Sequence, residues 1–216
     1  MAYTKEVFKH PAELVWAAAC AAQRINGTYA KSIVISDSDP SLNVTPNRDI
    51  MRRMIVENTV TAADVEQGKL VRKYFQGLTF QILKGKTLNE FQNNALAISN
   101  RDEIVSNYDI AVIASLPSSY ERGRKSDDVA ARIRDAKGGH LDRVGAKGVT
   151  TNVEVLRCIF SQQWMTYFVT GITDRDQPIF FAYKNPLEVG LHITIRGNVK
   201  AHRDDSTQLN RVKVIN

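Results

Sequence analysis

Cysteine and long apolar runs are both scarce in this sequence, and each shortage excludes a class of protein. Only two cysteines, Cys20 and Cys158, occur among 216 residues, so the chain is not a small secreted domain held together by several disulfide bonds. The longest apolar stretch, residues 14–22, is too short to span a bilayer. We find no signal peptide. We therefore expect a soluble, cytoplasmic protein that does not contact a membrane.

The sequence also lacks the short motifs that mark common enzymes. It contains no GxxxxGK[ST] phosphate loop, no GxGxxG, no CxxC, no HExxH and no GxSxG. The four histidines have no carboxylate or cysteine at the spacing of metal ligands: His10, His140, His192 and His202. We therefore expect no catalytic residues and no cofactor.

Three pairs of neighbouring aspartates are the remaining candidates for a metal site: Asp37 with Asp39, Asp127 with Asp128, and Asp204 with Asp205. Each pair lies in an expected loop or at a helix start, where aspartate is an ordinary turn or capping residue. We therefore expect no metal site and a protein that is not an enzyme. A metal-dependent nuclease that uses Asp204 and Asp205 is the weakest of three hypotheses.

Positive charge exceeds negative charge. The 29 Lys and Arg residues outnumber 23 Asp and Glu residues, which gives a formal net charge of +6 and a sequence pI near 9.3. A basic balance of this size favours polyanionic partners such as nucleic acid. Since 43% of the residues are hydrophobic, the chain can also bury a sizeable core.

The first part of the chain predicts helices, and we expect residues 1–139 to form a mainly helical domain. The expected helices cover residues 12–25, 46–57, 61–83, 87–99, 110–116 and 127–136. Thr45 is expected to cap the second helix, with Pro46 as its first residue. Thr61 with Asp64 and Thr87 with Glu90 resemble capping boxes.

Residues 140–216 predict a β-rich domain. Short strands are expected at residues 149–160, 164–173, 178–183, 192–201 and 207–215, separated by turn residues. Five strands in about sixty-five residues match the size of an OB-fold, a barrel that binds oligonucleotides on its second and third strands and with the loops after strands 1 and 4. An SH3-like barrel fits the same spacing. We expect an α+β chain that ends in a five-stranded, antiparallel, OB-like barrel.

Aromatic residues crowd into residues 160–183: Phe160, Trp164, Tyr167, Phe168, Phe180, Phe181 and Tyr183. Neighbouring residues in a strand point to opposite faces, so a small barrel cannot bury both members of an adjacent pair. If Phe181 fills the core, Phe180 faces outward, with Phe168 beside it and Trp164 at the barrel mouth. Exposed rings beside cations are suited to base stacking. The alternative is that the helical domain covers these rings.

Cations accompany the rings on the expected strands. Ile193, Ile195 and Val199 alternate with polar residues, which predicts one buried and one basic face of the fourth strand. The candidate phosphate-binding residues are Arg157, Arg196, Lys200, Arg203, Arg211 and Lys213. With Trp164, Phe168 and Phe180 they make up the predicted nucleic-acid site, in which rings and cations share one side. The alternative is a solvated strand face with no ligand.

Three segments near the C-terminus resemble the closing strands of OB-type modules in bacteriophage replication and recombination proteins: residues 187–190, 193–202 and 207–213. The resemblance covers residues 140–215. It implies a non-enzymatic, single-stranded DNA-binding or recombination-accessory role in the host cytoplasm, with RNA, a second copy of the chain and phage replication proteins as further candidate partners. Single-strand binding proteins of phages and bacteria commonly carry an acidic C-terminal tail, which this chain lacks, so strand coating or an accessory role is expected instead of a replication hub.

A second hypothesis belongs to a different functional class. The chain could be a phage-encoded interaction factor whose barrel engages a host or phage protein, with the aromatic cluster as the binding hot spot and the basic residues as its rim. The sequence leaves the oligomeric state and the choice between DNA and RNA open.

Overall fold

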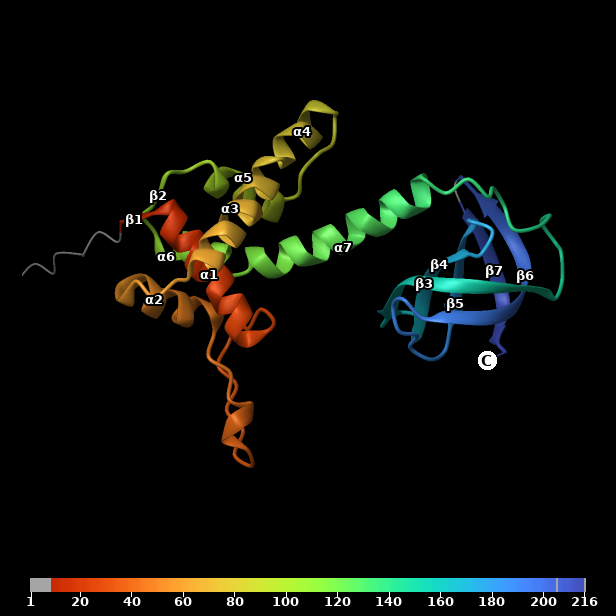
Figure 1. The fold of residues 1–216 in the computed structure, drawn as a ribbon, viewed down its shortest axis with the longest axis horizontal. Helices are drawn as coiled ribbons and strands as arrows, with labels where there is room; N and C mark the ends of the chain where they lie inside the picture. Colours follow the sequence, from red (N-terminus) through yellow and green to blue (C-terminus); the bar gives the residue numbers. More distant parts are fainter. Residues whose placement is uncertain (1–8, 205, 216) are drawn as a thin grey trace, which may run out of the picture. The chain divides into compact units, whose positions relative to one another are not determined.

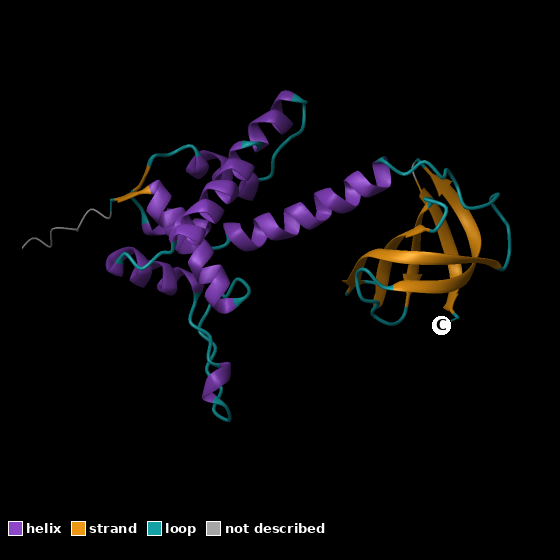
Figure 2. Ribbon diagram, in the orientation of Figure 1, coloured by secondary structure: helices purple, strands orange, loops and turns teal. Residues whose placement is uncertain are grey.

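The computed structural model describes residues 9–204 and 206–215 (Figure 1). It divides into two compact units, Met1–Gly123 and Arg124–Asn216. The first is helical and the second is dominated by strands (Figure 2). The boundary falls inside one helix, so the strand-rich unit begins earlier in the chain than the expected domain of residues 140–216. None of the helices in the described part of the chain is long and apolar enough to cross a membrane.

The helical unit contains a pair of two-residue strands and most of the helices of the chain. Its elements are β1 (His10–Pro11), α1 (Ala12–Asn26), the 3-10 turn η1 (Pro40–Leu42), α2 (Asn47–Glu57), α3 (Ala62–Gln76), α4 (Leu78–Leu83), α5 (Glu90–Ser99), β2 (Glu103–Ile104), α6 (Asn107–Ile113) and the first part of α7 (Leu116–Arg134). The helices before residue 100 lie close to their expected ranges. The helix expected at residues 110–116 is found three residues earlier, as α6, and the one expected at residues 127–136 begins eleven residues earlier, at the start of α7.

Helix α1 forms part of the buried core of this unit. Its residues from Val15 to Ala22 are buried, and most of them are alanine. Small side chains let helices approach closely: a Cβ on Gly68 of α3 would come within 2.9 Å of the backbone nitrogen of Ala17. Trp16 and Phe75 fill the wider part of the same core, with ring centroids 6.4 Å apart.

An ion pair between the exposed Arg24 and the buried Asp64 joins α1 to α3. The guanidinium of Arg24 donates to both carboxylate oxygens of Asp64, at 3.0 and 2.9 Å, and the Thr61 hydroxyl donates to the same carboxylate at 2.7 Å. Burial raises the pKa of Asp64, but the hydrogen bonds from Arg24 and Thr61 outweigh it and leave the pKa below its usual value. The expected capping box of Thr61 and Asp64 is confirmed.

The caps of α5 and α2 and the interior of the expected long helix also differ from the sequence prediction. Helix α5 is capped by Asn89 with Gln92 and not by Thr87 with Glu90, because the asparagine side chain offers the same kind of acceptor two residues closer to the helix. Helix α2 has Pro46 itself as its N-cap residue, without a side-chain cap. The expected long helix of residues 61–83 is interrupted at Gly77, which separates α3 from α4, since glycine weakens a helix interior.

The second unit contains a closed barrel of five strands. These are β3 (Val149–Ser161), β4 (Thr166–Thr173), β5 (Pro178–Tyr183), β6 (His192–Arg203) and β7 (Ser206–Val214), each close to its expected range. The order around the barrel is β3-β4-β5-β7-β6. Its first three strands form a meander, and the last strand inserts between β5 and β6. This arrangement is OB-like.

One feature of the expected barrel is wrong. The sequence prediction makes all strand pairs antiparallel, whereas β5 and β7 pair in parallel, from Ile179 opposite Thr207 to Phe181 opposite Leu209. The parallel pair follows from the insertion of β7 beside β5, since both strands then run in the same direction. Mixed strand directions also argue against a simple antiparallel meander of the SH3 kind.

Alternating side chains fill the barrel. The buried set comes from all five strands: Val153, Val155, Val169, Ile179, Phe181, Ile193, Ile195, Val199 and Leu209. The alternation predicted for the fourth strand is confirmed, because Ile193, Ile195 and Val199 are buried while Arg196 and Lys200 are exposed. The barrel thus has an apolar interior, and the charged side chains of β6 lie on its outer surface.

The connection of residues 135–148 is fixed to the barrel. The side-chain nitrogen of Gln177 donates to the backbone oxygen of His140 at 2.9 Å, and the imidazole rings of His140 and His202 stack with centroids 3.9 Å apart. Further along, the backbone nitrogen of Val199 donates to the oxygen of Ala146 at 2.9 Å. The residues of this connection therefore form part of the surface beside β6.

Candidate nucleic-acid interface

Two phenylalanines stack on the outside of the barrel. Phe168 of β4 lies opposite Ala182, and Phe180 of β5 lies opposite Thr170, so both rings point away from the core. Their centroids are 5.6 Å apart and their planes differ by 26°. Phe181, the neighbour of Phe180, is fully buried. The predicted outward orientation of Phe168 and Phe180 is confirmed.

The strands on either side add polar and apolar neighbours to this pair. On β3, Arg157 lies opposite Thr170 and Ile159 lies opposite Phe168. On β7, Gln208 lies opposite Phe180. Arg157 and Ile159 are exposed, while both phenylalanines are half-buried. We call the outward surface formed by Arg157, Ile159, Phe168, Thr170, Phe180 and Gln208 the aromatic face.

Trp164 lies in the turn between β3 and β4, which is the loop after the first barrel strand. Its side chain is 65% exposed, and the following Met165 is 73% exposed. Phe160 and Tyr167 flank the turn, with ring centroids 5.0 Å apart. Among the ring contacts of the described residues, none joins Trp164 to Phe168 or Phe180. Trp164 therefore lies beside the aromatic face as a separate exposed ring.

Most of the candidate cations lie on another side of the barrel. Arg196 of β6 is directly opposite Lys213 of β7, and both are exposed. Lys200 and Arg211 belong to the same two strands. Arg203 ends β6 opposite Ser206, at the turn into β7. Since β6 pairs only with β3 and β7, it lies across the barrel from β4 and β5.

The expectation that rings and cations share one side of the barrel is therefore wrong for most of the cations. The structure brings Arg157 beside Phe168 and Phe180, and places Arg196, Lys200, Arg211 and Lys213 together on β6 and β7. The physical reason is the strand order, which inserts β7 between β5 and β6. Ile159 and Gln208 were missed by sequence reasoning, because only the pairing register shows that they flank the rings.

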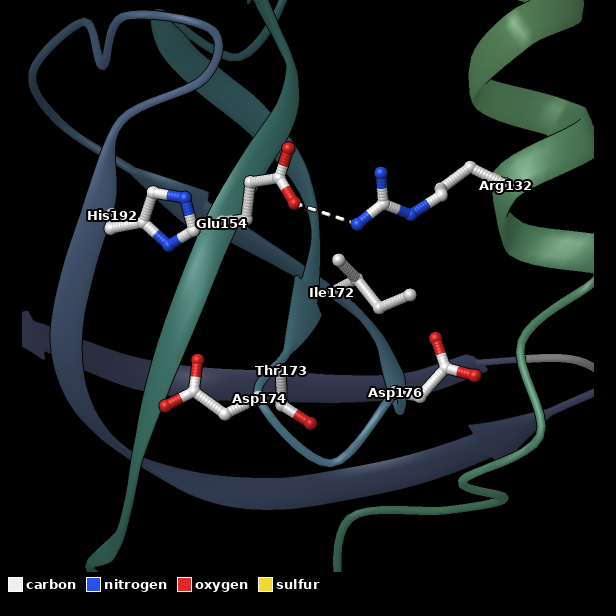
Figure 3. A pocket seen from close by; sticks show the side chains of 7 residues that line it. All are labelled: Arg132, Glu154, Ile172, Thr173, Asp174, Asp176 and His192. Atoms are coloured by element: carbon white, nitrogen blue, oxygen red, sulfur yellow. Dashed lines mark hydrogen bonds and ion pairs between the residues drawn. The ribbon is translucent and has the colours of Figure 1, made fainter.

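Three carboxylates line a pocket formed by β3, the β4–β5 turn and the end of α7. A cavity of about 240 Å³ is lined by Arg132, Glu154, Ile172, Thr173, Asp174, Asp176 and His192. Figure 3 shows Arg132 extending from α7 toward Glu154 of β3, and their side chains form an ion pair at 2.8 Å. Asp174 and Asp176 lie on the turn between β4 and β5. Carboxylates repel a phosphate backbone, so this part of the surface is poorly suited to nucleic acid.

No group of three or more histidine, cysteine, aspartate or glutamate side chains within residues 9–204 and 206–215 could hold a metal ion. Asp204 follows Arg203 in the turn between β6 and β7, and Asp205 lies outside the described residues. Comparison of the chain with protein-family models, with curated proteins and with solved structures found no match.

Proposed function

We propose that this protein binds single-stranded nucleic acid, most specifically single-stranded DNA, without catalysing a reaction, as a strand-coating or accessory protein of phage replication or recombination. The observation that carries the proposal is the stacked pair of Phe168 and Phe180 on the outside of β4 and β5. These are the second and third strands of an OB-like barrel, the surface on which such barrels bind oligonucleotides.

Base stacking gives the aromatic face its expected affinity. Each base that stacks on an aromatic side chain contributes about 1 to 3 kcal/mol, judged from alanine substitution in other proteins, and every base has a face that can stack. Thr170 and Gln208 flank Phe180 on the neighbouring strands and offer hydrogen bonds to base edges. Trp164, in the loop after the first strand, extends the surface with another exposed ring.

Phosphate neutralisation on this face depends on few cations. Arg157 lies on the strand next to the two rings, and Lys184 is exposed directly after β5. Each neutralised phosphate of a single strand contributes about −0.7 to the slope of log affinity against log salt concentration. Two such contacts therefore predict a slope of about −1.4 for a short oligonucleotide.

A titration with labelled oligo-dT tests the proposal. Fluorescence anisotropy of an oligonucleotide of about 12 nucleotides, within the site size of one OB-fold, is measured at low and at physiological salt. We expect saturable binding that weakens as salt rises, with the shallow slope given above. If no binding occurs even at low salt, the proposed function is wrong.

A protein-binding role is the second candidate, and one observation favours it. Residues 160–165, at the end of β3 and in the turn to β4, expose three large apolar side chains: Phe160, Trp164 and Met165. Exposed apolar clusters of this kind are common at protein interfaces. A stoichiometric protein partner that remains bound after nuclease treatment, and is lost on Trp164→Ala, would support this role.

A further inference from the structure

Two cations face each other across β6 and β7 without a carboxylate to separate them. Arg196 and Lys213 are register partners, a position in which side chains on neighbouring strands interact and like charges repel. Among residues 9–204 and 206–215, the ion pairs include neither of them, nor Lys200 or Arg211. An anion between these side chains would relieve the repulsion.

Backbone irregularities occur at two further cations of β6 and β7, Lys200 and Arg211. The register between β6 and β7 shifts once between Arg196 and Asn198 and again between Val199 and Ala201. The first shift includes Arg211, whose φ of 52° is in the left-handed region, and the second includes Lys200. Bulges redirect side chains and concentrate near functional sites, and strained backbone is retained more often at such sites.

The connection before β3 adds further positive charge here. Its backbone is fixed to β6 on both sides of Lys147: Ala146 accepts from Val199, and Gly148 donates to the side chain of Asn198 at 2.9 Å. The guanidinium of Arg196 lies against Gly148, where a Cβ would come within 3.1 Å of it. Lys147 is exposed. We call the surface of Lys147, Arg196, Lys200, Arg211 and Lys213 the cation face.

The cation face has no phenylalanine, tyrosine or tryptophan ring for base stacking. Its side chains are long cations, so we expect charge and hydrogen bonds to dominate ligand recognition there. Phosphate contacts of this kind need no unpaired base and carry no sequence information. The chemistry therefore fits the backbone of a duplex.

We propose that the cation face is a second nucleic-acid-binding surface, which takes the phosphate backbone of double-stranded DNA independently of the aromatic face. Strand β6 lies across the barrel from β4 and β5, which carry Phe168 and Phe180, while β7 borders both β5 and β6. Figure 3 shows that Glu154 of β3 and Asp174 and Asp176 of the β4–β5 turn line one pocket. The barrel can then hold an unpaired strand and a duplex at once. The inference stands apart from the proposed function, because a blunt duplex offers no unpaired base to the rings.

Three double variants of the full chain test this assignment with a blunt DNA duplex of about two helical turns, that is about 20 base pairs. Arg196→Gln with Lys213→Gln removes two charges from the cation face but keeps side-chain length. Phe168→Ala with Phe180→Ala removes the aromatic face. Lys84→Gln with Lys86→Gln removes the same charge between α4 and α5, in the helical unit, and serves as the matched control.

The cation-face variant is expected to bind the duplex about tenfold or more weakly, and its salt slope should become shallower by about 2, one unit for each lost phosphate contact. The phenylalanine variant and the lysine control should bind the duplex within about twofold of the unmodified chain. Excess duplex should also leave oligo-dT bound. Equal loss of duplex binding in the phenylalanine variant, displacement of oligo-dT by duplex, or no duplex binding at low salt would overturn the inference.

Discussion

Arg196 and Lys213 are direct register partners across β6 and β7, and both side chains are exposed. A protein selected only for stability would place opposite charges at such a pair, because like charges opposite each other are destabilising. The like-charged pair therefore lowers the stability of the barrel, a cost that the proposed binding of phosphate to the cation face would explain. It leads to a prediction in which stability and binding change in opposite directions.

Replacing Lys213 with glutamate should stabilise the barrel and weaken duplex binding. The new carboxylate would face Arg196, and an exposed pair of opposite charges contributes about 0.2 to 1 kcal/mol. Thermal unfolding followed by circular dichroism measures the first effect, and anisotropy with the duplex measures the second. A variant that loses stability and binding together would instead indicate that Lys213 has a structural role.

Acid should weaken the helical unit through Asp64. The pKa of this carboxyl is held below its usual value by Arg24 and Thr61, so its charged form stabilises the folded chain at neutral pH. The contribution is present above the ordinary aspartate pKa of about 4 and is lost as the pH falls through the lower pKa of the folded state. Loss of a hydrogen bond to a charged group costs about 1.5 to 3 kcal/mol.

Urea unfolding, followed by helical circular dichroism at pH 7 and pH 3, measures this loss against the Asp64→Asn variant. The free energy of unfolding should fall less with acid in the variant, which has no carboxyl to protonate at this position. An identical pH dependence in both chains would contradict the role given to Asp64.

Cys20 should resist thiol reagents while the chain is folded. Burial, together with the nearby carboxylates of Asp64 and Glu121, raises the pKa of its thiol to about 12, and the reactive form is the thiolate. In a Cys158→Ser variant, which leaves Cys20 as the sole cysteine, we expect no labelling at pH 8 without denaturant and complete labelling in urea. Mass spectrometry of the Cys20 peptide gives the answer, and rapid labelling of the folded chain would show that the α1 core opens readily.

Local patterns explain why the elements of this fold could be predicted. The capping box of Thr61 and Asp64 depends on residues three apart, and the alternation of Ile193, Ile195 and Val199 with polar residues lies within one strand. Such signals do not need distant parts of the chain. Where two local signals compete, as at Thr87 and Asn89, the sequence alone does not decide between them.

The sequence could not predict in the same way which side of the barrel carries the rings and which carries the cations. Alternation shows that Phe180 and Arg196 both leave the core, but it does not show toward which side of a closed barrel each points. That depends on strand order, and the insertion of β7 between β5 and β6 is a long-range event without a local signal. The same insertion gives the parallel pairing of β5 with β7, which the sequence prediction also lacks.

The most direct test of the central claim compares oligo-dT binding by the unmodified chain, by Phe168→Ala with Phe180→Ala, and by Phe80→Ala. Phe80 is an exposed phenylalanine of α4 in the helical unit and controls for loss of a surface ring. We predict that the barrel of the double variant stays folded and unfolds in one cooperative transition, but that the variant binds oligo-dT more weakly by about 1 to 3 kcal/mol for each stacked base lost. The Phe80→Ala variant should bind normally. Unchanged affinity in a folded double variant would contradict the claim.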